Sequence, residues 1–120
     1  MVDGRVLNAP RVNQGVVWFT FQELCEKPLG AADYLSLVSR YHTVLLSGIP
    51  VMAPEQRNEA KRFATLIDIL YEHKVKLVCN AATAPEGLYP AGNGAREFAR
   101  TVSRLNEMQT AQYLSFQRDG

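Results

Sequence analysis

One segment of the chain, residues 43–81, constrains the fold more than any other. A short apolar run at residues 43–49 and a second at residues 75–81 enclose a mixed stretch over about residues 55–73. In that stretch, apolar side chains recur at steps of three and four residues: Ala60, Phe63, Ala64, Ile67, Leu70 and Tyr71. This spacing predicts an amphipathic helix, and the flanking runs are typical of strands buried on both faces of a parallel sheet. The segment therefore predicts a βαβ unit with parallel strands and a right-handed crossover.

Further elements are predicted on the N-terminal side of this unit, so the expected fold class is α/β, a small parallel sheet flanked by helices. Residues 16–21 are β-branched and aromatic, which predicts a strand that buries Trp18 or Phe19. A turn of helix before Pro28 and a helix over about residues 30–41 follow that strand.

On the C-terminal side, residues 82–94 contain two prolines and three glycines and predict an irregular loop. A further helix is predicted by apolar residues at helical spacing: Phe98, Val102, Leu105 and Met108. Thr110 is expected to cap a last short turn. We expect one α/β core over residues 16–114, an extended lead-in at 1–15 with an edge strand at Arg5–Leu7, and a frayed tail at 115–120.

Composition is that of an ordinary soluble globular domain, with 120 residues of which 47% are hydrophobic and 21% charged. Thirteen Lys and Arg residues against twelve Asp and Glu leave a net charge of +1, so we expect no nucleic-acid partner. No apolar run approaches the roughly 20 residues of a membrane-spanning helix, and no secretory leader is recognised. These features predict a cytoplasmic protein without membrane insertion.

The residues with reactive side chains form no familiar constellation. Cys25 and Cys79 lie far apart and outside any zinc-type spacing, so we expect two inert buried thiols and no metal site. His42 and His73 each follow a predicted helix, where a cation interacts favourably with the dipole. The patterns of a phosphate-binding loop, a dinucleotide fold, a nucleophile elbow and a zinc helix do not occur. The sequence therefore predicts no complete catalytic site.

Several strings of the chain, in order and over nearly its whole length, are those of one protein family. They are FTFQELC (19–25), PLGAADYL (28–35), HTVLL (42–46), IP (49–50), RNEAKRF (57–63), LID (66–68), LYEH (70–73), VKLV (75–78) and RTVSRLNEMQ (100–109). The chain resembles the C-terminal part of the ZapE-type AAA+ ATPases, bacterial cell-division ATPases with mitochondrial relatives. The resemblance implies a P-loop NTPase-type fold and ATP hydrolysis by the complete protein.

The family's Walker A loop and acidic Walker B strand belong to an N-terminal half that the matching strings do not include. The resemblance therefore implies that residues 1–120 are a fragment, and that ATP and Mg²⁺ are held only through the missing half. The partners it implies are that N-terminal ATPase half or a neighbouring protomer, with FtsZ or other division proteins. An apolar surface is expected where the missing half docks.

The βαβ unit is also arranged like a Walker B strand followed by a sensor strand, as in a degenerate repeat. Asn80 and Thr83 fall where a sensor residue would lie, and residues 47–50 and 80–85 should meet at one edge of the sheet, where ligands of open α/β sheets bind. The alternative is that both segments are only turns.

Four arginines in the matching strings are candidates for nucleotide or interface contacts, because a guanidinium can stabilise a transferring phosphate. For Arg57 and Arg62 the alternative is a solvated helix flank, with Glu59 and Arg62 as an ordinary i,i+3 pair. Arg100 and Arg104 share a helix face and repel each other, which favours an anionic partner. That partner is Glu97 or Glu107 of the same helix, an acidic surface of the missing half, or a nucleotide.

The remaining candidates have simpler interpretations. Asp68 lies on the polar stripe of the long helix, either solvated or in contact with the missing half. Asp33 and Tyr34 are expected to serve as helix start and core. Two functions stay open: an ATPase region that supplies interface and arginines, and a non-catalytic protein-binding module that keeps the family's fold. A small hydrolase has no nucleophile elbow to support it.

Overall fold

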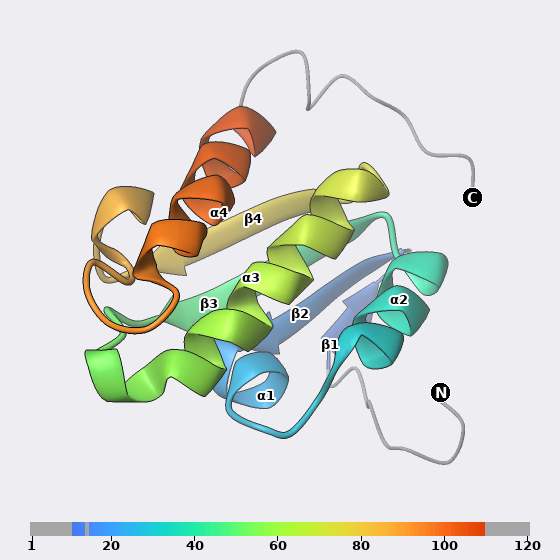
Figure 1. Ribbon diagram of the computed structural model, residues 1–120. Coiled ribbons are helices and arrows are strands. Elements are labelled where there is room, and N and C mark those ends of the chain that lie inside the picture. Colours follow the sequence, from blue (N-terminus) through green and yellow to red (C-terminus); the bar gives the residue numbers. More distant parts are fainter. Residues whose placement is uncertain (1–10, 14, 110–120) are drawn as a thin grey trace.

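A four-stranded sheet and a layer of helices form the molecule in the computed structural model, which describes residues 11–13 and 15–109 (Figure 1). The strands are β1 (Arg11–Asn13), β2 (Val16–Thr20), β3 (Thr43–Ile49) and β4 (Lys76–Ala81). The helices are α1 (Phe21–Cys25), α2 (Ala31–Arg40), α3 (Arg57–Glu72) and α4 (Ala95–Met108), with 3₁₀ turns η1 (Pro54–Gln56) and η2 (Pro85–Gly87). The sheet order is β1-β2-β3-β4, in which β1 is antiparallel to β2 while β2, β3 and β4 are parallel. The predicted α/β class is confirmed.

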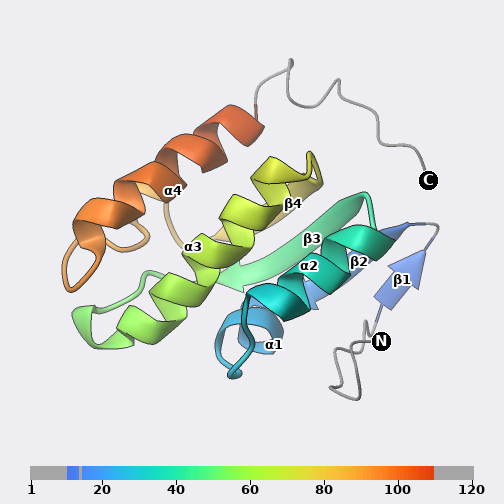
Figure 2. The same cartoon turned by 45° about the vertical axis from the view of Figure 1, so that its right-hand side comes forward.

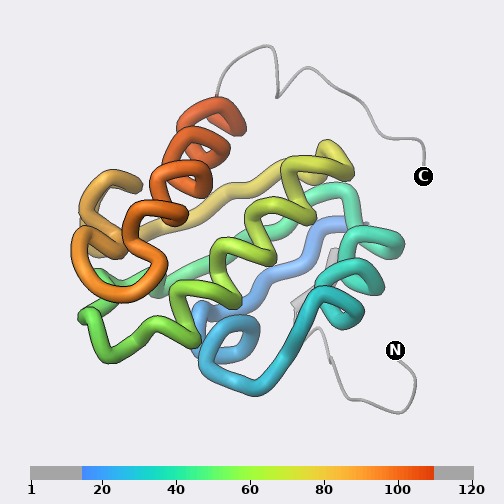
Figure 3. The backbone as a smooth tube through the Cα atoms, viewed as in Figure 1, coloured from blue at the N-terminus to red at the C-terminus, as the bar shows by residue number. Residues whose placement is uncertain are grey.

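The predicted βαβ unit is present as β3, α3 and β4. The helix proper begins at Arg57, slightly later than expected, because the preceding three residues form η1 instead. It ends at Glu72, and Lys74 takes a positive φ of 58° in the turn toward β4. Figure 3 shows the chain passing from strand to helix to strand while every helix stays on the same side of the sheet.

The core lies between the helices and one sheet face, and a row of aromatic rings joins its parts. The ring of Phe63 on α3 lies 6.0 Å from that of Phe21 and 6.1 Å from that of Phe98. Phe98 in turn meets Tyr89 edge-on at 5.6 Å. Residues 82–94 were expected to be irregular throughout, yet they contain η2 and bury Leu88 and Tyr89. The aromatic row thus ties this loop to the core.

The opposite sheet face is not covered by any residue that the structure describes, as Figure 2 shows from the side. Trp18, Leu45 and Val78 are register partners on β2, β3 and β4. Trp18 is 42% exposed, Val78 is 59% exposed, and Leu45 is half-buried. The prediction that the strands at residues 43–49 and 75–81 are buried on both faces is therefore wrong within the part of the chain that the structure describes, because all of the described helices pack on the other face. Of the two candidate core rings, Phe19 is the buried one.

Local side-chain contacts define where the first helices begin. Thr20 and Glu23 form a reciprocal capping box at α1, with the Glu23 carboxylate 2.8 Å from the Thr20 amide nitrogen. The Asp33 carboxylate accepts a hydrogen bond from the Gly30 N–H, and Tyr34 is fully buried, as expected. The predicted lead-in contains β1, whereas the predicted edge strand at residues 5–7 and the turn after Thr110 lie outside the described residues.

Replacement of Phe63 by alanine should lower the free energy of unfolding by about 3–5 kcal/mol, because it removes the central ring of the aromatic row. Val51→Ala is the control, since Val51 is 49% exposed in a loop and should change stability by less than about 0.5 kcal/mol. Urea denaturation followed by circular dichroism measures both. Equal effects of the two substitutions would contradict this description of the core.

Candidate functional site

The Arg104 side chain forms ion pairs with residues of α3. Its guanidinium bonds the Asp68 carboxylate on α3, and its second nitrogen lies 3.6 Å from a Glu72 oxygen. The same guanidinium sits 4.8 Å from the centre of the Tyr71 ring. Its ion-pair partners thus lie on α3, whereas the predicted alternatives were Glu97 or Glu107 of its own helix, the missing half and a nucleotide. A hydrogen bond links Tyr71 Oη to Glu107 at 2.8 Å instead, and this contact raises the pKa of Tyr71.

The Arg62 side chain caps the C-terminal end of α1. Its Nη1 donates a hydrogen bond to the carbonyl oxygen of Cys25 at 3.1 Å. Cys25 is the last residue of α1. A cation at a helix C-terminus satisfies an otherwise orphan carbonyl and interacts favourably with the dipole. The partner of Arg62 is therefore a main-chain oxygen of α1 rather than Glu59.

Arg57 and Arg100 differ from these two. Both are exposed, and within residues 11–13 and 15–109 neither side chain forms an ion pair or hydrogen bond. Arg57 lines a cavity between α3 and α4, whereas Arg100 lies on the outer surface of α4. The four candidate arginines therefore fall into two structural members, Arg62 and Arg104, and two with guanidinium groups available to an outside anion.

The carboxyl ends of β3 and β4 meet at one edge of the sheet. The Asn80 amide oxygen accepts a hydrogen bond from the Gly48 N–H at 2.7 Å. Gly48 has a φ of +75° and lies where the pairing of β3 with β4 shifts register, so the Asn80 side chain replaces a ladder contact there. Thr83 is exposed, and its hydroxyl packs close to Gly87 of η2. Sensor-like roles of Asn80 and Thr83 stay predictions.

Sequence reasoning did not identify the apolar row Trp18–Leu45–Val78, although its members are the alternate residues of three predicted strands. The Trp18 ring nitrogen donates to the Ser47 hydroxyl at 3.0 Å, which fixes the ring against β3. In a continuous apolar strand, the sequence does not show which alternate residues face a covering layer. The apolar residues could therefore be recognised, but not the sheet face to which each belongs.

The histidines and cysteines add no reactive cluster. His42 follows α2 and its Nδ1 lies 2.8 Å from the Thr43 hydroxyl, while His73 is the C-cap residue of α3. Cys25 is buried and burial raises the pKa of its thiol, as expected of an inert cysteine. Cys79 was expected to be buried but is exposed, because β4 lies at the rim of the sheet.

The described part of the chain, residues 11–13 and 15–109, holds neither a metal cluster nor a membrane-spanning helix. No three or more of its His, Cys, Asp or Glu side chains group so that they could hold a metal ion. No helix among the described residues has the length and apolar character needed to cross a bilayer.

The Asp68–Arg104 pair should contribute about 0.5–1 kcal/mol of coupling energy between α3 and α4, because it is only partly buried. A double-mutant cycle with Asp68→Asn and Arg104→Gln, followed by urea denaturation, measures that energy. Arg100→Gln is the matched control and should leave stability unchanged. A coupling energy of zero would mean that the pair is not formed in solution.

In the folded protein, a thiol reagent should label Cys79 and leave Cys25 unmodified until urea unfolds the chain. Partial desolvation raises the pKa of the Cys79 thiol, so its reaction should be slower than that of free cysteine. Mass spectrometry of timed samples identifies the modified residue. Labelling of both thiols at one rate would show that this placement of Cys79 or Cys25 is wrong.

Comparison with known proteins identifies the family. The sequence model described as AFG1-like ATPase matches residues 1–117. Cell division protein ZapE of Escherichia coli K12 is 36% identical, with 94% of this chain and 30% of ZapE covered. Lactation elevated protein 1 homolog B of Danio rerio is 33% identical, with 93% and 29% covered, and an uncharacterised protein of Schizosaccharomyces pombe is 43% identical, with 94% and 31% covered.

No solved structure matches the chain. The chain spans about 30% of the length of the curated relatives. The family model covers nearly all of the 120 residues, and the resemblance read from the sequence strings is thereby confirmed. This chain belongs to the AFG1-like ATPase family.

Proposed function

We propose that this chain is the region of an AFG1-like ATPase that docks its uncovered sheet face onto the nucleotide-binding region and supplies an arginine to ATP hydrolysis. The observation that carries the proposal is the apolar row Trp18–Leu45–Val78 on parallel strands. Parallel sheets occur almost only with both faces covered, and burial of apolar surface contributes about 25 cal/mol per Å². A covering layer is therefore the expected complement of this face.

The length of the relatives is consistent with that complement. The chain matches only 29–31% of each curated relative, so most of a family member is available to cover the sheet face. In this proposal the nucleotide-binding region holds ATP and Mg²⁺, as the resemblance implies. In this proposal the described residues of this chain form the docking surface, but they do not form a complete catalytic site.

Arg100 is the arginine that we assign to the nucleotide. Arg62 and Arg104 are occupied by a helix carbonyl and by Asp68, and Arg57 faces a cavity. Arg100 is exposed on α4 in the helical layer, and in this proposal it reaches the nucleotide of a neighbouring protomer. A guanidinium delivered in this way stabilises the negative charge that develops on the transferring phosphate.

The biological setting follows by analogy with the bacterial relative, whose name ties it to cell division. We extend the proposal to a role in cell division, with FtsZ or another division protein as target of the assembled ATPase. The two free thiols, Cys25 and Cys79, fit a reducing compartment such as the cytoplasm.

The docking face is tested by calorimetric titration of this chain with the part of E. coli ZapE that lies outside the matched region. Val78→Lys should weaken binding at least about tenfold, because it places a charge in the apolar row. Leu35→Lys is the matched control, since Leu35 is 45% exposed on α2 in the helical layer, and should bind like the unmodified chain. Equal binding by all three would contradict the proposal.

The catalytic contribution is tested in the same mixture by phosphate release from ATP. Arg100→Ala should lower the rate at least about tenfold while the complex still forms, whereas Arg96→Ala on the same helix should leave it unchanged. A complex that forms without any change in ATP hydrolysis would instead support the non-catalytic binding module.

A further inference from the structure

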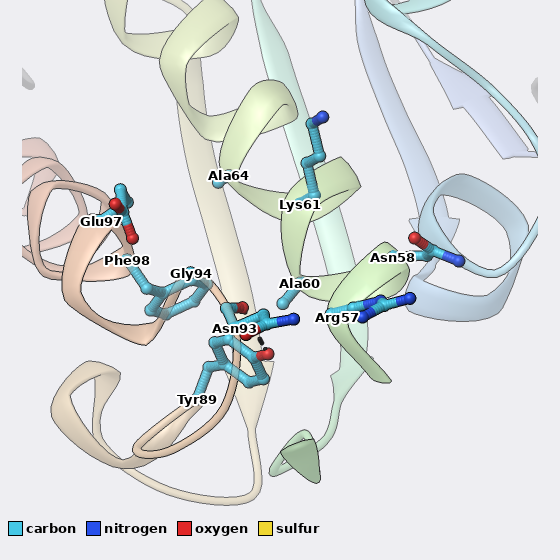
Figure 4. Close-up of a pocket in the computed structure, with 10 residues that line it drawn as sticks. All are labelled: Arg57, Asn58, Ala60, Lys61, Ala64, Tyr89, Asn93, Gly94, Glu97 and Phe98. Carbon is cyan, nitrogen blue, oxygen red and sulfur yellow. Dashed lines mark hydrogen bonds between the residues drawn. The ribbon is translucent and has the colours of Figure 1, made fainter. Parts of the chain in front are cut away.

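A cavity of about 510 Å³ lies between the N-terminal halves of α3 and α4, on the helical layer and away from the apolar sheet row (Figure 4). This volume is within the range of about 300–1,000 Å³ typical of ligand sites. We call it the α3–α4 pocket. None of its lining residues belongs to the apolar row Trp18–Leu45–Val78, so the proposed docking of the sheet face leaves it open.

One wall of the pocket is cationic. Arg57 and Lys61 stand one turn apart on α3, and Asn58 lies beside them. Both cations are exposed, and among the described residues no carboxylate pairs with either side chain. Two like charges at this spacing destabilise a helix by a few tenths of a kcal/mol, so the wall is suited to an anionic group from outside.

The floor of the pocket is apolar and narrow. Ala60 and Ala64 have short side chains, which leave space beside α3 at this point. Phe98 and Tyr89, both almost fully buried, close the bottom of the pocket. The Phe98 ring stacks on Phe63 at 6.1 Å and receives Tyr89 edge-on at 5.6 Å. Because the Phe98 ring is already occupied by these neighbours, the floor favours a compact apolar side chain over a stacked nucleobase.

The wall opposite α3 differs in charge from the cationic wall. The Tyr89 hydroxyl donates to the Asn93 carbonyl at 2.7 Å, which holds the loop that leads into α4. Glu97 lines the pocket on this side and repels a second anionic group. Negative charge is therefore favoured beside α3 and disfavoured beside Glu97.

We propose that the α3–α4 pocket binds an acidic peptide segment of a partner protein, with one apolar side chain over Ala60 and Ala64 and flanking carboxylates on Arg57 and Lys61. Carboxylates match a guanidinium in bidentate geometry, and the apolar residue supplies the anchor that a charged contact alone lacks. The unequal walls fix the orientation of the segment. This inference does not depend on ATP hydrolysis or on the sheet face.

The test uses fluorescence anisotropy with a pool of fluorescein-labelled hexapeptides, each with one leucine, isoleucine or phenylalanine flanked by aspartate and glutamate. Members of the pool should bind, and the same peptides with asparagine and glutamine should not. Arg57→Gln with Lys61→Gln should weaken binding at least about tenfold, and so should Ala64→Leu, which fills the floor without changing charge. Arg96→Gln, a charge removal elsewhere on the surface, is the matched control.

Thermal unfolding of each variant establishes that it is folded before binding is measured. Failure of every acidic peptide to bind at up to about 1 mM would overturn the proposal. So would displacement of the peptides by ATP alone at low concentration, because the pocket would then be a nucleotide site. Val78→Lys should bind the peptides normally, so a failure of the sheet-face proposal and a failure of this one give different results.

Discussion

Burial of the apolar stripe of α3 is the interaction on which the rest of the structure depends. Five of its residues are buried between the sheet and the neighbouring helices: Ala60, Phe63, Leu66, Ile67 and Leu70. Phe63 contacts rings from α1 and α4 and so joins segments that are far apart in the sequence. Because the other helices gather around α3, the helical layer is complete on one side and the opposite sheet face stays uncovered among the described residues.

The charged residues on the polar side of α3 have two different roles. In its C-terminal half, Asp68 and Glu72 attract Arg104 and hold α4 in place. In its N-terminal half, Arg62 caps α1. Arg57 and Lys61, also near its N-terminus, have no such neighbours among the described residues and line the α3–α4 pocket. The neighbours of each basic side chain thus decide whether it stabilises the fold or is available to a partner, since Arg62 and the adjacent Lys61 differ in this way.

The sequence predicted the βαβ unit well, because the three- and four-residue spacing of α3 and the two apolar runs are local signals. It did not predict which face of the strands is covered, since Leu45 and Leu46 look alike in a continuous apolar run. Nor did it predict the partners of Arg62 and Arg104, which lie on other elements. Exposure of Cys79 depends on the edge position of β4, which only the assembled sheet defines.

Trp18 reports directly on whether the sheet face of this chain is a docking surface. It is the single tryptophan of the chain and lies in the apolar row. The measurement is its fluorescence on addition of a nucleotide-binding region whose own tryptophans have been replaced by phenylalanine. Docking of the sheet face should shift the Trp18 emission to shorter wavelength and protect Trp18 from iodide quenching in the complex. A complex that leaves the emission and quenching of Trp18 unchanged would contradict it.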